Sequence, residues 1–77
     1  MEKYTDNKPK FVNEEIELKD MPLLTVSQAS QLFNLGARTI RGLVASHPKA
    51  NWFLMNGNRV MIKNDLFKDY IYRQTRI

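Results

Sequence analysis

The stretch that decides the fold is TVSQASQLFNLGARTIRGLVAS, residues 25–46. Its first half places apolar side chains at the spacing of one helix face, at Val26, Ala29, Leu32 and Phe33. Thr25, followed three residues later by Gln28, has the pattern of a capping box, in which two side chains pair with the first backbone amides of a helix. The pattern predicts a short amphipathic helix that begins near Val26.

A tight turn separates this helix from a second one. Asn34 and Gly36 both tolerate a positive φ, which lets the chain leave one helix and enter the next within three residues. Two short helices joined in this way are typical of a helix-turn-helix.

The second helix, which we expect to end between Ser46 and Pro48, has faces of different character. Its inward positions are apolar, at Ile40, Leu43 and Val44. Arg38 and Arg41 share another face with Ala45, and a third face carries Thr39 and Gly42. The exposed side is therefore basic and short-chained, and it suits close approach to a partner.

The length of 77 residues allows one domain, which buries only around 60% of the surface that its unfolded chain exposes. A deep catalytic cleft is not expected. The chain has no cysteine, so it has neither a disulfide nor a thiolate ligand, and we expect a reducing cytoplasm. No apolar run approaches the roughly 20 residues of a membrane helix, and the N-terminus lacks the apolar core of a signal peptide. No membrane association is predicted.

The charge is unevenly distributed along the chain. Residues 1–21 hold four Lys and six Asp or Glu, a net −2, whereas residues 22–77 hold eight Lys or Arg and two Asp, a net +6. A compact basic domain attracts polyanions, and contacts to phosphates release counterions and make binding salt-dependent. Charge alone leaves two interpretations open: a nucleic-acid partner, or a solvated basic surface that binds nothing.

Catalytic and metal-binding residue sets are lacking in the sequence. His47 is the single histidine, so a metal site would have to consist of carboxylates alone, and a general base would lack an orienting partner. We interpret it as a residue at a helix C-terminus or in a loop. The sequence predicts no enzyme, no metal or other cofactor, and no small-molecule substrate.

Residues 1–20 are polar and charged, with isolated apolar positions and no sustained helical period. They predict a flexible acidic leader in front of a folded domain of residues 21–77. A short edge strand, or a segment that folds on a partner, remains an alternative for the leader. Pro22 biases the residue before it away from helix, so residues 21–24 should run extended into the first helix.

The segment NWFLMNGNRVMIK, residues 51–63, predicts a β-hairpin. Two β-prone runs, residues 52–55 and 60–62, flank Asn56-Gly57, the favoured dipeptide of a type I′ turn. A turn centred on Gly57-Asn58 would shift every pairing, and the sequence leaves both registers open. The strand before Thr25 could complete a small three-stranded sheet.

The hairpin tip combines small and polar residues with a guanidinium group. Asn58 and Arg59 lie where the wing of a helix-turn-helix protein contacts a phosphate or the minor groove, and plain turn chemistry is the alternative. We expect Arg59 to contact DNA, because Lys63 and the arginines of the second helix add to the same basic face.

A last helix is predicted after the hairpin. Asn64 is expected to cap it, with Asp65 in the first turn, where a negative charge suits the helix dipole. Its apolar stripe, interpreted as core, consists of Leu66, Phe67, Tyr70 and Ile71.

The predicted order of strand, helix, turn, helix, hairpin and helix resembles the winged-helix module shared by excisionases and the DNA-binding heads of MerR-type regulators. The segments LTVSQASQLFNLG, residues 24–36, and ANWFLMNGNRVMIK, residues 50–63, resemble the small excisionases of conjugative transposons. The resemblance covers about residues 22–72. It implies an α+β fold, a winged helix-turn-helix with three short helices and a small antiparallel sheet.

This resemblance implies a non-enzymatic recombination directionality factor. Such excisionases bind double-stranded DNA near the ends of a mobile element, often as several copies side by side, and bend it to promote excision by a tyrosine-family integrase. Carried over by position, Arg38, Thr39 and Arg41 fall on the recognition helix and Arg59 falls on the wing. Two alternatives remain: a small winged-helix transcriptional regulator that binds a promoter operator, and an adaptor whose basic face binds an acidic protein.

Overall fold

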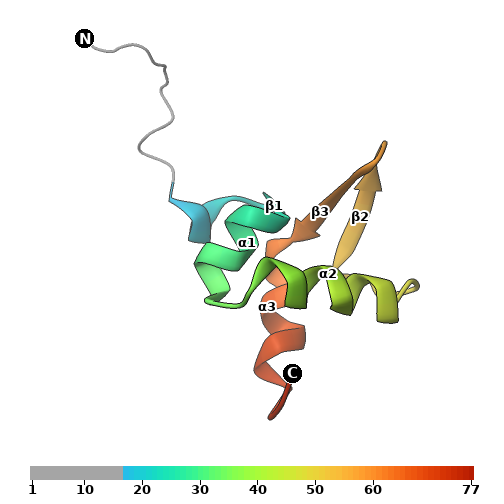
Figure 1. The fold of residues 1–77 in the computed structure, drawn as a ribbon. Coiled ribbons are helices and arrows are strands. Elements are labelled where there is room, and N and C mark those ends of the chain that lie inside the picture. Colours follow the sequence, from blue (N-terminus) through green and yellow to red (C-terminus); the bar gives the residue numbers. More distant parts are fainter. Residues whose placement is uncertain (1–16) are drawn as a thin grey trace, which may run out of the picture.

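The computed structural model describes residues 17–77. Residues 1–16 of the predicted leader lie outside the described residues. The described residues form three α-helices and a three-stranded antiparallel sheet, which confirms the predicted winged-helix architecture (Figure 1). The elements follow one another in the order η2, a 3₁₀ helix (Leu18–Asp20), β1 (Leu23–Thr25), α1 (Val26–Phe33), α2 (Ala37–Ser46), β2 (Phe53–Asn56), β3 (Arg59–Lys63) and α3 (Asn64–Tyr72).

Both helices of the fold-deciding stretch are confirmed. The backbone amide of Gln28 donates to Oγ1 of Thr25 at 3.1 Å, and the amide of Thr25 donates to Oε1 of Gln28 at 2.9 Å, so the capping box is complete. α1 ends at Phe33 because Asn34 turns the chain with a left-handed φ of 56°. Gly36 has a φ of −63° and serves as the N-cap of α2, so only one of the two expected positive-φ positions is used.

The sheet has the strand order β1-β3-β2, which confirms that the strand before Thr25 joins the hairpin. Asn56 pairs with Arg59, so the turn residues are Gly57 and Asn58. Of the two registers that the sequence left open, the structure therefore has the one with its turn at Gly57-Asn58 and not the type I′ turn at Asn56-Gly57. Among the described residues Gly57 has a φ of 64° and Asn58 has no positive φ, which is the pattern of a type II′ turn.

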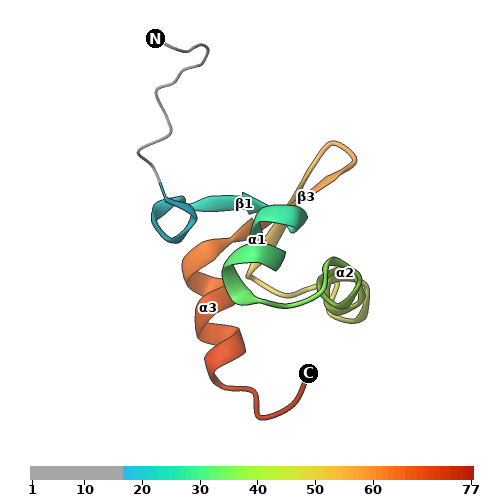
Figure 2. The ribbon, with the colours of Figure 1, turned by 60° about the vertical axis from the view of Figure 1, so that its left-hand side comes forward.

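This register determines which side chains meet on the sheet. It sets Phe53 opposite Ile62, and Ile62 is also paired with Leu24 of β1. Ile62 and Leu24 are fully buried, so the three side chains meet on the face of the sheet that the helices cover. The hairpin continues past the helices, and its tip projects beyond them (Figure 2).

The core lies between the sheet and the helices, and its buried apolar residues are Leu24, Val26, Ala29, Ile40, Trp52, Ile62 and Phe67. The ring of Phe67 on α3 is 5.0 Å from that of Trp52 and 5.1 Å, edge-on, from that of Phe33. α3 therefore closes the back of the domain, as predicted. Leu66 departs from the expected stripe and is 40% exposed, because it lies about 100° around the helix from Phe67.

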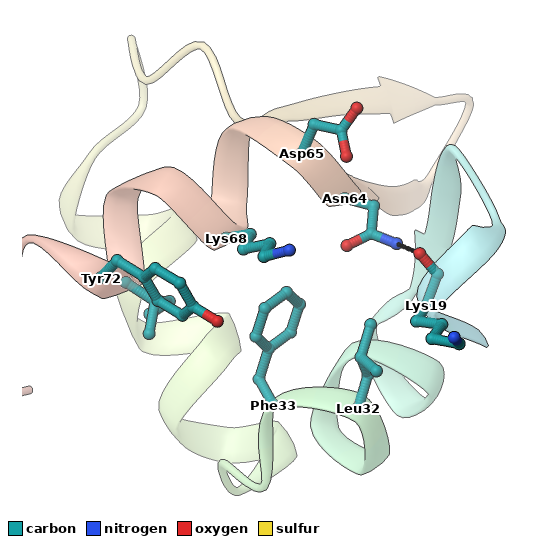
Figure 3. Close-up of a pocket in the computed structure, with 8 residues that line it drawn as sticks. Lys19, Leu32, Phe33, Asn64, Asp65, Lys68 and Tyr72 are labelled. Carbon is teal, nitrogen blue, oxygen red and sulfur yellow. Dashed lines mark hydrogen bonds between the residues drawn. The ribbon is translucent and has the colours of Figure 1, made fainter.

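A pocket of about 380 Å³ opens on the side of the domain formed by η2, the end of α1 and α3 (Figure 3). Lys19 and Lys68 line it together with Asp65, so its charges are mixed. Its apolar lining includes Leu32 and Phe33.

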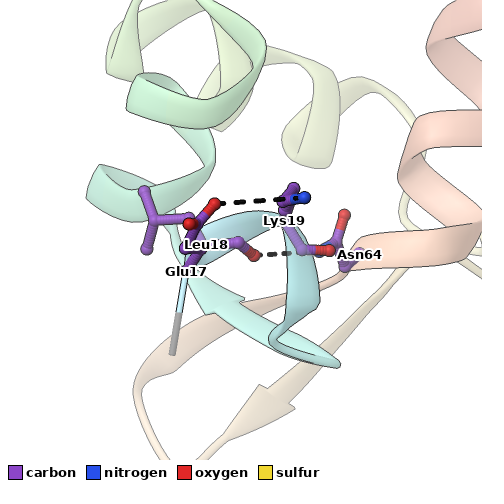
Figure 4. Close-up of polar contacts among 4 residues, drawn as sticks. All are labelled: Glu17, Leu18, Lys19 and Asn64. Carbon is purple, nitrogen blue, oxygen red and sulfur yellow. Dashed lines mark hydrogen bonds and ion pairs between the residues drawn. The ribbon is translucent and has the colours of Figure 1, made fainter. Parts of the chain in front are cut away.

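Asn64 does not cap α3, contrary to the sequence-based expectation. It is the first helical residue, it is 4% exposed, and its side-chain amide donates to the backbone oxygens of Leu18 at 3.2 Å, Lys19 at 3.2 Å and Met21 at 2.9 Å (Figure 4). These bonds hold η2 against the start of α3. η2, which precedes the predicted domain start at residue 21, is thus joined by hydrogen bonds to α3.

Candidate nucleic-acid interface

The exposed face of α2 is set by the burial of its opposite face. Ile40 is fully buried, and Leu43 and Val44 pack against the core, so the residues across the helix must point to solvent. We call the solvent-facing residues Arg38, Arg41, Gly42 and Ala45 the α2 outer face; all four are exposed. Arg38 and Arg41 lie one turn apart on it.

The wing is the turn and the adjoining ends of β2 and β3. The residues from Asn56 to Arg59 are all exposed, and Met55 beside them is 54% exposed. Asn58 lies in the two-residue turn, and Arg59 is the first residue of β3. Figure 2 looks nearly along α2 and shows the wing on the same side of the molecule as α2, with α3 and η2 on the other side.

A pocket of about 380 Å³ joins these two elements. We call it the α2–wing pocket; its lining residues are Thr25, Val26, Ser27, Arg41, Asn58, Arg59 and Val60. Arg41 comes from α2 and Arg59 from the wing, so two guanidinium groups that are 18 positions apart in sequence border one depression. The N-terminal end of α1 also lines it, through Val26 and Ser27.

The charges around this pocket are of one sign among the described residues. The acidic residues of residues 17–77 are Glu17, Asp20, Asp65 and Asp69, which lie in or beside η2 and on α3. The ion pairs within this part of the chain join Lys19 to Glu17 at 4.0 Å and Arg73 to Asp69 at 2.7 Å. Neither reaches α2 or the wing, so the arginines there meet no carboxylate of the described domain.

Thr39 and Lys63 lie apart from this cluster. Thr39 is exposed on α2 but lies on the side of the helix next to Gly36, where a methyl group added to the glycine would be 3.6 Å from Oγ1 of Thr39. Lys63 is at the far end of β3 from Arg59, roughly 13 Å along the strand. It is half-buried, pairs with Leu23 and precedes α3. Of the six residues predicted to contact DNA, the pocket brings together Arg41, Asn58 and Arg59.

Ser27 and Thr25 line the pocket but were missed by sequence reasoning. The capping box marked Thr25 as the start of a helix. The sequence carried no signal that this helix start lies beside Arg41 and Arg59, because that contact depends on how α1 packs against the hairpin.

The remaining observations on residues 17–77 concern metal ligands, membrane-spanning helices and His47. No group of three or more His, Cys, Asp or Glu side chains there could hold a metal ion, and no helix there has the length and apolarity that crossing a membrane requires. His47 is the C-cap residue of α2, which ends at Ser46. Its Nδ1 is 2.9 Å from the backbone oxygen of Leu43, and its ring centroid is 5.9 Å from that of Tyr70. Its contacts are those of a structural residue at a helix C-terminus.

The helix-turn-helix of α1 and α2, followed by a hairpin wing and a closing helix, defines a winged-helix protein. No protein-family model matches the chain. The chain is similar to the excisionase from transposon Tn916 of Streptococcus agalactiae serotype V (strain ATCC BAA-611 / 2603 V/R), with 37% identity over 57 residues, which covers 74% of this chain and 85% of that excisionase. The chain therefore belongs to the family of this excisionase.

Proposed function

We propose that this protein is an architectural DNA-binding protein that binds and bends double-stranded DNA near the ends of a mobile element and promotes its excision by a tyrosine-family integrase. The observation that carries the proposal is the α2–wing pocket, where Arg41 and Arg59 meet on a side of the domain without described acidic residues. Membership of the excisionase family supports the role in excision. The protein would act in the cytoplasm, on DNA.

In this proposal α2 enters the major groove. An α-helix with its side chains is about 10–12 Å across, and the major groove is about 12 Å wide, so α2 fits with its outer face toward the bases. Arg38 and Arg41 are exposed and can present guanidinium forks to guanine or phosphate. Thr39 lies in the first turn of α2, on the side next to Gly36, and would contact the wall of the groove through its hydroxyl or methyl group.

The wing would occupy the adjacent minor groove. Arg59 and Asn58 are the polar groups at its exposed end, and both also line the pocket beside Arg41. A small domain that grips neighbouring grooves from one side draws them together, and smooth bending of a short site by 40–90° costs on the order of 1–6 kcal/mol. Charge-assisted contacts from α2 and the wing would offset that cost. Lys63 would add to the long-range positive potential rather than to the pocket.

No step of strand cleavage is assigned to this chain. It would bend the DNA so that the integrase-binding sites come into position, while the integrase performs the covalent chemistry. Several copies could bind side by side and extend the bend.

Circular-permutation gel shifts on a duplex from the end of the element test the bend, and an excision assay with purified integrase tests the outcome. We expect DNA whose mobility depends on the position of the site, and excision that requires the protein. Arg41→Ala should weaken both, whereas Arg73→Ala, which removes the same charge from the residue directly after α3, should weaken neither. Unbent complexes, or excision that is equal without the protein, would contradict the proposal. Bound but unbent promoter DNA would favour the transcriptional regulator.

A further inference from the structure

Gly42 occupies an unfavourable position for a glycine. It lies inside α2, five residues after the helix begins and four before it ends, and it is exposed. Glycine is the poorest helix former after proline, because its backbone loses the most freedom on folding. A glycine at such a position needs a cause that outweighs this loss.

The described structure supplies no internal cause. A Cβ built on Gly42 meets no atom within 4 Å, so the residue is not small to make room for a neighbour. Gly57, in contrast, has a backbone φ of 64°, which residues with a side chain rarely adopt, and Gly36 is the N-cap of α2. Gly42 has neither role, since its backbone is helical and does not have a positive φ.

The neighbours of Gly42 on the helix surface indicate what could lie against it. Arg38 precedes it by four residues and Ala45 follows it by three, so both adjoin it on the α2 outer face. Arg41, the next residue back, borders the α2–wing pocket. The gap in the side-chain layer at Gly42 therefore lies beside Arg38, one position after Arg41, and faces solvent.

We propose that Gly42 is the point of closest approach between α2 and DNA, where a deoxyribose or a base edge of the major groove packs directly on the helix backbone. This inference rests on the proposed function. The contact is one of van der Waals packing, because the amide of residue 42 in an α-helix already donates to the carbonyl of residue 38. Arg38 and Arg41, which both precede Gly42 along α2, then reach the DNA beside this contact, and a side chain at position 42 would hold the helix and its arginines away from the DNA.

Gly42→Ala tests the inference because stability and affinity should move in opposite directions. Alanine is the better helix former and meets open space, so the variant's Tm should rise, by roughly 4–8 °C. Its affinity for a duplex from the end of the element should fall roughly tenfold, and that of Gly42→Leu roughly a hundredfold, since added volume overpacks the contact.

Gln31→Gly is the matched control, at an exposed position inside α1 that belongs neither to the α2 outer face nor to the α2–wing pocket. It lowers helix propensity instead of raising it, so Tm should fall while affinity, measured at a temperature where the variant is folded, stays within about twofold of the starting protein. The Tm values come from thermal unfolding followed by circular dichroism, and the affinities from fluorescence anisotropy at one fixed salt concentration.

Two results would overturn the inference in distinguishable ways. If the unaltered protein binds the duplex and Gly42→Ala binds it equally well or better, the close approach is wrong and the proposed function stands. If the unaltered protein does not bind duplex DNA at all, at low salt or with any end of the element, the proposed function fails and the inference fails with it.

Discussion

The two sides of this domain carry charge in different ways. On the side of α3 and η2, basic and acidic residues are mixed, and Arg73 and Asp69 form an ion pair at 2.7 Å. On the side of α2 and the wing, Arg38, Arg41 and Arg59 are exposed and have no carboxylate of residues 17–77 within ion-pair distance. The arrangement of charge therefore indicates a binding partner better than net charge does. Charges of both signs on one side neutralise one another, whereas a side with positive charges alone attracts a polyanion.

A substitution in the core should have the largest effect on the free energy of unfolding, because both sides of the domain pack on the same core. Phe67→Ala deletes the ring that packs on Trp52 and Phe33 and should cost about 3–5 kcal/mol of unfolding free energy. A domain of this size has only about 3–9 kcal/mol in total. Urea denaturation should therefore show a largely unfolded protein, and a well-folded variant would mean that α3 is not required for the core.

The unmixed side can be tested by removing charge from both of its elements. Arg41→Ala combined with Arg59→Ala should lower DNA affinity about a hundredfold and reduce the salt slope of log Kd by about two, because two phosphate-directed cations are lost. Fluorescence anisotropy over a salt series measures both quantities. Lys68→Ala combined with Arg73→Ala removes the same charge from α3 and its C-cap, and equal losses in the two double variants would abolish the distinction between the sides.

A third experiment concerns the polar contacts of the mixed side. Asn64→Ala leaves three carbonyl oxygens, of Leu18, Lys19 and Met21, without the amide that they share, and should cost about 2 kcal/mol of stability. DNA affinity of the folded variant should not change, since Asn64 lies on the other side from the wing. Chemical denaturation measures the stability, and fluorescence anisotropy measures the DNA affinity. Asp65→Ala, at the exposed neighbouring position, is the control.

The smallest effect is expected from the ion pair on α3. Arg73→Ala should change stability by less than about 0.5 kcal/mol, because both partners are well exposed and the pair is screened by solvent. Thermal unfolding in low and high salt measures it. A loss of more than 1 kcal/mol would show that this pair is a structural feature and that the mixed side is more than a solvated surface.

Local patterns in the sequence determined the elements of this protein. Thr25 and Gln28 specify a helix start through contacts three residues apart, and apolar spacing specifies α1 and α2, because these interactions are made within a single turn of chain. The hairpin was equally evident, whereas its joining to the strand before α1 was only a possibility at the level of sequence, which the sheet confirms. The resemblance to excisionases placed Arg38, Arg41 and Arg59 on the helix and wing of one domain.

Tertiary structure alone decided the turn register, the role of Asn64 and the grouping of site residues. The turn is at Gly57-Asn58, with Phe53 opposite Ile62, and Asn64 bonds to a segment more than 40 residues away in sequence. Lys63 and Arg59 share one strand yet lie at its opposite ends, and only Arg59 joins Arg41. Each of these depends on packing between elements distant in sequence, whose free energy no local pattern encodes.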